Sequence, residues 1–270
     1  MKKKIWMFYL LTTFVLSFSA WADDMQLSVT GFEENSMPEF VRPEAANGNW
    51  RFIAGTGPAY IPHYEGASAY SARPIPLFEA SNGNFFASIL SGIGYHFVKS
   101  RTFQFGARIA GAPGRKESVD PRLAGMGDLH TSGEVGLFLK AKFDHIYFTS
   151  KVSGGRRGSR AELGGGFDFT ASEADSLRLG IAANWASASY MQTYFGVTTE
   201  QAVTSSLAAY NAAGGIRSYG LVTSWTHVFN REWLSNLSLS AKRLAGSAIN
   251  SPLVQTESSY SASYVVLYLF

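Results

Sequence analysis

The sequence predicts an all-β protein, folded as a closed antiparallel transmembrane β-barrel of about twelve strands. Three observations predict it. The chain begins with the pattern of a secretory leader, and its composition is rich in aromatic residues and glycine but poor in charge. From residue 50 onward, apolar and polar side chains alternate with a period of two. These features together are typical of barrels that cross a membrane with strands.

Residues 1–22 have the three parts of a cleavable signal peptide. Lys2–Lys4 form a positive start, an apolar run extends to Ser17, and an A-x-A cleavage site ends at Ala22. An uncleaved anchor is the alternative, but a helix that crosses the membrane core needs roughly 20 apolar residues and this run is shorter. We therefore expect cleavage after Ala22. Residues 23–48 are polar and irregular, which predicts a periplasmic arm ahead of a barrel over residues 49–270.

The composition argues against several classes of function. The chain has no cysteine, which excludes disulfides and thiolate metal sites, and its five histidines form no H-x-x-x-H pair. We expect neither a metal nor a cofactor. Three of the 23 basic residues lie in the leader, so 20 basic and 20 acidic residues follow it. The net charge of +3 is therefore no reason to expect nucleic acid as a partner.

Twelve segments alternate well enough to be predicted as strands. In one of them, Leu177, Leu179 and Ile181 share a face, and Ser176 and Arg178 lie on the other. Such a strand fits a barrel with lipid outside and water inside, and it also fits a soluble β-sandwich. The predicted strands are 50–62, 70–80, 84–90, 93–98, 102–112, 132–142, 145–154, 160–171, 175–188, 215–229, 232–244 and 258–270.

The connections between these strands favour the membrane barrel. The long connections all fall at the same end of the predicted barrel as the medium one at 63–69, and the other connections are tight turns. The long connections are 113–131, 189–214 and 245–257. Outer-membrane barrels have this pattern, with short periplasmic turns, longer external loops and an even number of strands. Residues 84–98 are the weak point, because two short strands there could be one bent strand. A ten-stranded barrel is the alternative.

The last segment has an aromatic face and ends on an aromatic residue. A terminal strand of this kind closes a barrel without leaving an edge, although an ordinary apolar strand would look similar. The ending resembles the C-terminal signature by which outer-membrane proteins are sorted for insertion. We expect the outer membrane of a Gram-negative bacterium, with membrane lipid and lipopolysaccharide as neighbours. The residues on that face are Tyr260, Ala262, Tyr264, Val266, Tyr268 and Phe270.

Four blocks of sequence resemble a known family in the right order. The clearest is Tyr190–Val197, which is similar to the family's Y-x-x-x-Y-F/Y-G-V segment, followed by a small-residue–Leu–x–x–Tyr element that ends at Tyr210. A second block, Arg243–Val254, resembles R-L-x-G/D followed by D-S-P-I/M-V. The others lie at 114–128 and 58–76. The family is the MltA-interacting protein (MipA) / OmpV family of outer-membrane proteins.

The resemblance covers about residues 50–270 and implies a function without catalysis. Its founding member looks like an adaptor that joins a lytic transglycosylase to a bifunctional peptidoglycan synthase, so the leading hypothesis is an outer-membrane scaffold for murein enzymes. No catalytic residue carries over. The chain departs from the family at Asn250, where an acid is usual, and at Ala208-Ala209, which replaces a Leu-Pro or Arg-Gly type pair. Both departures lie in loops, where partner contacts could differ.

Two external features are candidate contact sites. The loop 189–214 is aromatic at its base, which fits either a constriction or partner-facing loop, or an aromatic girdle that continues into solvated chain. Arg156 and Arg157 form a basic tip that could bind lipopolysaccharide phosphates, or could be a flexible charged loop. The aromatic residues are Tyr190, Tyr194, Phe195 and Tyr210.

The strand pattern also places charges on the inner wall. A basic interior could attract anions, which makes a small-solute channel the second hypothesis. The alternative is an interior filled by side chains that pair with one another, as in other small barrels. The inward basic residues are Arg108, Lys140, Lys142, Lys151, Arg178 and Lys242. The inward acidic residues are fewer, namely Glu162 and Asp168.

A third and minor hypothesis is a barrel lipid hydrolase. His130, Ser132 and Glu134 fall at alternate positions on one strand face. A nucleophilic serine needs a base within hydrogen-bond reach and an acid that orients the base. Because such triples recur by chance in serine-rich strands, we predict that the protein is not an enzyme.

Overall fold

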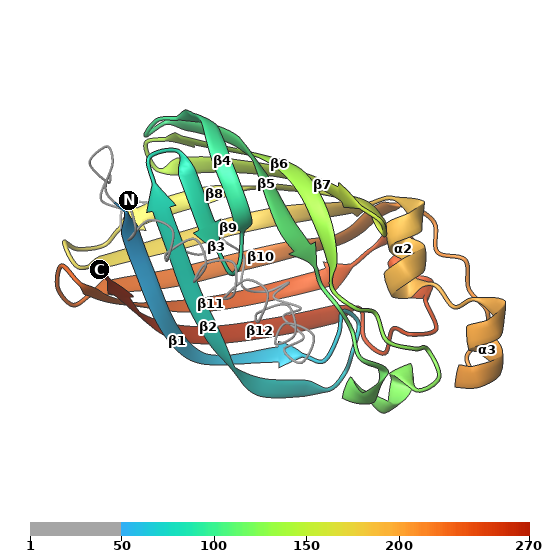
Figure 1. Cartoon of the computed structure of the whole chain (residues 1–270). Helices are drawn as coiled ribbons and strands as arrows, with labels where there is room; N and C mark the ends of the chain where they lie inside the picture. The colour runs from blue at the N-terminus through green and yellow to red at the C-terminus, as the bar shows by residue number, and fades with distance from the viewer. Residues whose placement is uncertain (1–49) are drawn as a thin grey trace, which may run out of the picture.

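A computed structural model describes residues 50–270, which form one closed barrel of twelve antiparallel strands (Figure 1). Each strand pairs with the next along the chain, and β12 returns to pair with β1. The predicted leader and periplasmic arm lie outside the described residues. The strands are β1 (Arg51–Pro62), β2 (Tyr70–Asn82), β3 (Phe85–Ser88), β4 (Gly92–Lys99), β5 (Phe103–Ala112), β6 (Ser132–Phe143), β7 (Ile146–Gly155), β8 (Gly158–Thr170), β9 (Asp175–Ala186), β10 (Gly215–Val228), β11 (Trp233–Leu244) and β12 (Ser258–Leu269).

The strand number confirms the prediction of twelve, and the ten-stranded alternative is wrong. Residues 84–98 form two separate strands, and β3 pairs with both β2 and β4. A tight turn separates β2 from β3, with Gly83 at a φ of +55°, a backbone conformation that glycine adopts readily. β3 is nevertheless the shortest strand of the barrel, with four residues.

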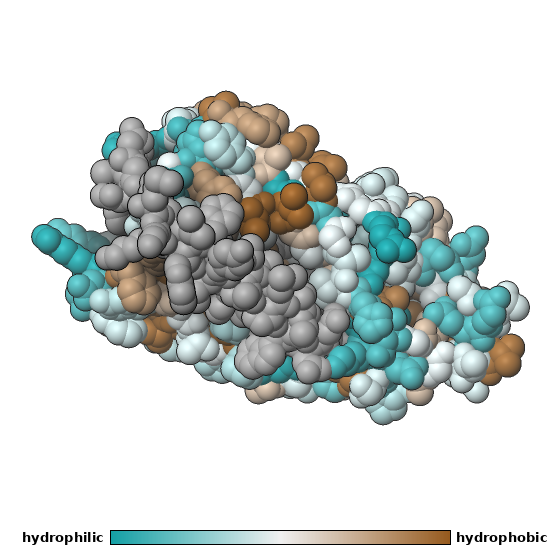
Figure 2. Space-filling view, viewed as in Figure 1, coloured by the Kyte–Doolittle hydropathy of each residue, from teal (hydrophilic) through white to brown (hydrophobic). Residues whose placement is uncertain are grey.

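The period of two places apolar side chains outside and polar ones inside. On β9, Leu177, Leu179 and Ile181 are exposed, and the alternating Ser176 and Arg178 are buried. Figure 2 shows hydrophobic side chains gathered over strands β5–β7, and hydrophilic ones at the end of the barrel that carries α3. An apolar outer belt of this kind is what a hydrocarbon environment requires.

β12 closes the barrel with the aromatic face outward, as its sequence predicts. Tyr260, Tyr264 and Phe270 are exposed, whereas Val265 and Leu267 face inward and are buried. β1 lies very close to β12. A side-chain carbon added at Gly57 would lie 1.8 Å from the carbonyl oxygen of Tyr264, so only glycine allows the two backbones to meet there.

The long connections contain helices that the sequence analysis treated as loop. α2 (Ala188–Phe195) begins where the Ser187 side chain accepts a hydrogen bond from the backbone of Tyr190. α3 (Thr199–Ser205) begins with a complete capping box between Thr198 and Gln201. Three short 3-10 helices lie in the neighbouring connections: η3 (Glu117–Val119), η4 (Pro121–Leu123) and η5 (Gly246–Asn250). Among the described residues, no helix is long and apolar enough to cross a membrane.

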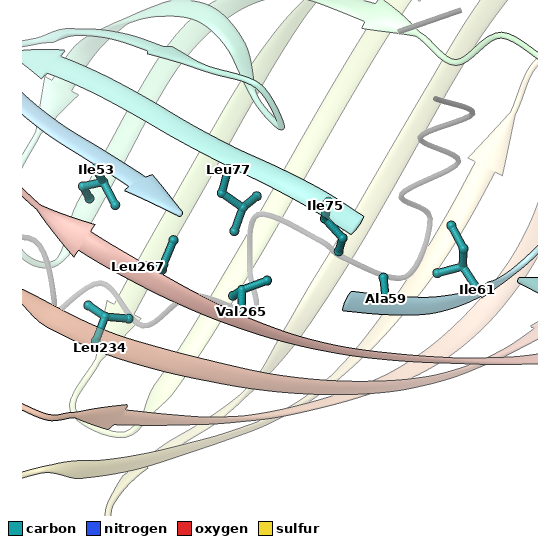
Figure 3. Close-up of a cluster of buried hydrophobic side chains, with 8 residues drawn as sticks. All are labelled: Ile53, Ala59, Ile61, Ile75, Leu77, Leu234, Val265 and Leu267. Atoms are coloured by element: carbon teal, nitrogen blue, oxygen red, sulfur yellow. The ribbon is translucent and has the colours of Figure 1, made fainter. Parts of the chain in front are cut away.

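One side of the interior is apolar, which the prediction of a polar interior missed. Side chains from β1, β2, β11 and β12 point into a shared space inside the barrel (Figure 3). They alternate along the strands with exposed residues such as Tyr60 and Tyr264. We call this cluster the apolar inner wall; it comprises Ile53, Ala59, Ile61, Ile75, Leu77, Leu234, Val265 and Leu267.

Candidate functional site

The longer connections pack against one another at one end of the barrel. We call this assembly the roof; it comprises residues 63–69, 113–131, 187–214 and 245–257. Two buried apolar clusters hold it together, one around α2 and one around Leu123 and Leu253. Among residues 50–270, the strands at the other end of the barrel are joined by short turns. By the rule for outer-membrane barrels, the roof is the external end.

Helix α2 anchors the roof to the strand ends. Its Tyr190, Met191 and Phe195 are 1–2% exposed and belong to a cluster with Ala186 and Leu244, the last residues of β9 and β11. Tyr190 and Phe195 were predicted from the sequence as possible partner contacts. Their burial instead places them in the core of the roof, where they cannot touch a partner without rearrangement.

Tyr194 links α2 to two neighbouring loops. Its hydroxyl donates to the carbonyl of Pro113 over 2.7 Å, and Arg157 donates to both that carbonyl and the Tyr194 hydroxyl. Arg157 also bonds the carbonyl of His130, and Arg115 donates to the Tyr194 carbonyl over 3.0 Å. Burial raises the pKa of Tyr194 to about 12 and lowers that of Arg115 to about 10.

The two predicted tip arginines therefore differ. Arg157 is tied into the roof by these bonds, whereas Arg156 is exposed. A lipopolysaccharide phosphate could reach Arg156 directly, but it would have to compete with backbone carbonyls for Arg157.

Tyr210 and Tyr64 fasten the remaining loops. The Tyr210 hydroxyl donates to the carbonyl of Ser247 over 2.6 Å, and its backbone pairs with Val197. The Tyr64 hydroxyl donates to the carbonyl of Leu253 over 2.7 Å, and burial raises its pKa. Each loop of the roof is thus bonded to a loop far away in the sequence.

A buried charge cluster lies beneath the roof. The Glu65 carboxylate bonds Arg217 and lies 3.6 Å from the ammonium group of Lys242, and all three side chains are at most 13% exposed. Burial alone would raise the pKa of Glu65, but attraction to Arg217 and Lys242 outweighs it, and the pKa falls below its ordinary value. Arg160 forms a second pair with Glu134 over 2.9 Å.

The other predicted inner charges lie on the barrel wall, mostly beside carboxylates. Arg178 forms a two-point contact with Asp168, at 2.6 and 2.9 Å, and Lys142 meets the same carboxylate at 2.9 Å. Lys151 pairs with Glu162 over 3.2 Å. Arg108, on the neighbouring strand β5, donates to the carbonyl of Ser91 over 3.5 Å. Lys140 is half-buried on the inner face of β6.

The three residues of the hydrolase hypothesis are not assembled as a relay. The Ser132 hydroxyl is buried and has no hydrogen-bond partner among residues 50–270, and Glu134 instead accepts from Arg160. Within the same residues, no group of three or more histidine, aspartate and glutamate side chains is placed to hold a metal.

Sequence reasoning missed Glu65, Arg115 and Arg217. Glu65 and Arg115 lie in predicted loops, where a charge is ordinary. Arg217 lies near the start of β10, close to where a strand emerges from the membrane. The sequence clue was that Glu65 and Arg115 both lie in family-like blocks, at 58–76 and 114–128.

A closed antiparallel barrel with an apolar outer belt, short turns at one end and packed loops at the other defines a transmembrane β-barrel protein. The chain belongs to the family described as MltA-interacting protein MipA, which it matches over residues 54–270. This match confirms the resemblance found in the sequence. A comparison with curated proteins found no match.

Solved structures that match the chain include a porin, an outer-membrane channel and a toluene transporter, all at low sequence identity. The NanC porin is 7% identical with a TM-score of 0.44, over 80% of this chain and 98% of that one. An outer-membrane channel from Pseudomonas putida F1 is 7% identical with a TM-score of 0.44, over 87% and 99%. The Pseudomonas putida toluene transporter TodX is 11% identical with a TM-score of 0.37, over 83% and 89%.

Proposed function

We propose that the protein is a non-enzymatic outer-membrane scaffold that holds murein enzymes at the membrane. Its partners are a lytic transglycosylase and a bifunctional peptidoglycan synthase, met at the end with short turns. Membership of a family described by its interaction with MltA supports this assignment. Membrane lipid and lipopolysaccharide surround the barrel wall.

The observation that carries the proposal is the packed roof. Its loops bury two apolar clusters and bond one another across long sequence separations, which is costly to rearrange and suits a fixed anchor. The opposite end offers the surface that faces the periplasm and its murein. There the turns carry exposed polar residues of both signs, including His145, Glu173 and Arg231.

Site-specific photocrosslinking in living cells tests the proposal with the full chain. A photoreactive amino acid is placed at His145, Glu173 or Arg231 in the short turns. Val203 on α3, which is 83% exposed at the other end, is the matched control. We expect adducts with a lytic transglycosylase or a peptidoglycan synthase from the turn positions and none from Val203. Recovery of only lipopolysaccharide and assembly factors from every turn position would refute the scaffold.

A small-solute channel is the second candidate, and the inner arginines and lysines favour it. Arg108, Lys140 and Lys242 lie on the inner face, where cations would draw anions inward. Planar bilayers with the purified protein test this function. Anion-selective conductance steps would support the channel. If the protein is shown to have inserted into the bilayer and no steps appear, the channel function is ruled out.

A further inference from the structure

A groove crosses the outer wall of the barrel from β7 to β12. It has a volume of about 1070 Å³, and its lining is almost entirely apolar. The side chains that line it include exposed residues of the apolar outer belt, such as Phe148, Ile181 and Leu221. The groove therefore opens to the membrane, on the face opposite the charged interior.

The groove follows a row of paired residues that runs from strand to strand. Five steps of about 4.8 Å between neighbouring strands make this row about 24 Å long. One leaflet of a membrane supplies about 15 Å of hydrocarbon, half of a core of about 30 Å, so the groove is long enough to hold a whole acyl chain. The paired residues in the row are Tyr260, Ala241, Leu221, Ile181, Gly165 and Phe148.

Small residues hollow out the groove and favour lipid as its occupant. Gly165, Ala183 and Ala241 face outward with little or no side chain. They lie beside large residues such as Leu163 and Leu221, which are exposed. Atoms that line a void lose dispersion contacts, so the hollow is more stable when it is filled. A flexible acyl chain can follow an irregular hollow, and no hydrophobic force favours a second protein over lipid there.

The end of the groove beside the roof is polar. Arg243 lines this end and lies one residue before the end of β11, where the chain enters the roof. Its partner across the strands is Ser258, the first residue of β12. Tyr219 and Tyr260 line the same end and are exposed, and exposed tyrosines mark the level of the lipid head groups. Arg243 therefore lies at the head-group level of the external leaflet.

The charge at this end suits a phosphorylated head group. The Arg243 side chain is 73% exposed, and its guanidinium donates to the Glu257 carboxylate over 3.1 Å. An exposed ion pair of this kind is weak, and a guanidinium has five N–H donors arranged to bind phosphate in a two-point contact. The Glu257 carboxylate opposes an anion in part, so its neutralisation should strengthen phosphate binding. An apolar groove with an arginine at its external end thus fits an anionic lipid of the external leaflet.

We propose that the groove is a specific binding site for lipid A, the phosphorylated acyl-chain anchor of lipopolysaccharide. One acyl chain lies in the hollow around Ala183 and Ala241, and a phosphate of the head group accepts hydrogen bonds from Arg243. This inference goes beyond the scaffold function. It concerns the outer wall rather than the short turns, so either can fail without the other.

Native mass spectrometry of the purified protein in detergent tests the proposal. The probe is lipid A with both phosphates, and phosphatidylglycerol is the anionic lipid for comparison. We expect saturable retention of a single lipid A by each barrel, and about tenfold weaker binding of phosphatidylglycerol. Arg243→Gln should weaken the binding of lipid A about tenfold, and Glu257→Gln should strengthen it.

Matched variants separate the groove from general contact with lipid. Ala183→Leu and Ala241→Leu fill the hollow and should each weaken binding, whereas Ala107→Leu, on the outer face of β5 and outside the groove, should leave it unchanged. Gel electrophoresis of unheated samples establishes that each variant is folded. Equal binding of lipid A by the parent, Arg243→Gln and the two groove variants would overturn the proposal, and so would equal affinity for phosphatidylglycerol. Weaker binding by Arg156→Gln alone would also overturn it, because the site would then lie at the tip between β7 and β8.

Discussion

Replacement of Glu65 by glutamine should destabilise the barrel through the roof. Glu65 is the carboxylate between Arg217 and Lys242, and the three side chains are 13%, 5% and 11% exposed. Removing one partner of a buried ion pair leaves the other charge without compensation, which costs about 3–5 kcal/mol. Glutamine keeps the size of the side chain, so lost packing contributes little to this loss.

Urea unfolding in lipid vesicles, followed by tryptophan fluorescence, measures the effect. The matched control is Glu257→Gln, because Glu257 pairs with Arg243 where the two side chains are 47% and 73% exposed. Exposed pairs contribute about 0–1 kcal/mol, so the control should unfold almost as the parent does. Equal destabilisation by the two variants would refute the argument that burial makes the Glu65 cluster important.

The same cluster predicts a pH dependence of stability. The folded pKa of Glu65 is lowered, so its stabilisation is fully present above the unfolded pKa of about 4.3 and is lost as the pH falls through the lower folded value. The parent should therefore lose stability on acidification below about pH 4, and Glu65→Gln should lose less over the same window. An identical acid response in parent and variant would contradict this assignment.

Three further predictions concern closure, the roof and catalysis. Gly57→Ala should prevent β1 from pairing with β12 and lower the yield of folded barrel, measured by gel electrophoresis of unheated samples. Gly133→Ala, where the added carbon would have open space around it, should fold normally. Tyr194→Phe removes a hydroxyl donor and should cost about 1 kcal/mol, detected as faster hydrogen exchange in the roof; unchanged exchange would argue against the bond. Ser132→Ala should leave any lipid-hydrolysing activity of the preparation unchanged, and loss of such an activity would revive the hydrolase hypothesis.

The strands were predictable because their pattern is local. Alternation such as Leu177, Leu179 and Ile181 against Ser176 and Arg178 fixes both the strand and its outward face. A closed barrel then follows, because each tight turn forces neighbouring strands to pair. Even the doubtful region 84–98 was predicted as two strands, and it forms β3 and β4.

The roof was not predictable, because its contacts join distant parts of the chain. Tyr64 meets Leu253 and Glu65 meets Arg217, across 189 and 152 positions. One local feature was present and missed. Thr198 followed by Gln201 is a capping-box pattern that marks the start of α3, inside what had been treated as loop.

The incomplete pairing between β2 and β3, which involves only Glu79–Asn82 of β2, lay between these two cases. Pro74 and Pro76 in a predicted strand indicate an edge, but a closed barrel has none, so their meaning depends on knowing that β3 is short. The apolar inner wall was hidden for a related reason. The inner face of β12 begins with serines and becomes apolar only at Val265 and Leu267, and the aromatic outer face with Tyr260 and Tyr264 was the stronger signal.

The packed roof has a consequence for how such a surface can evolve. External loops of a cell-surface protein are where a host or a phage exerts selection, and loops ordinarily vary freely because little depends on them. Here the loops bury two apolar clusters and bond one another, so most changes in their interiors would also cost the stability of the barrel. We expect escape from recognition to concentrate at outlying positions such as Arg156 and Val203, with the loop interiors held constant.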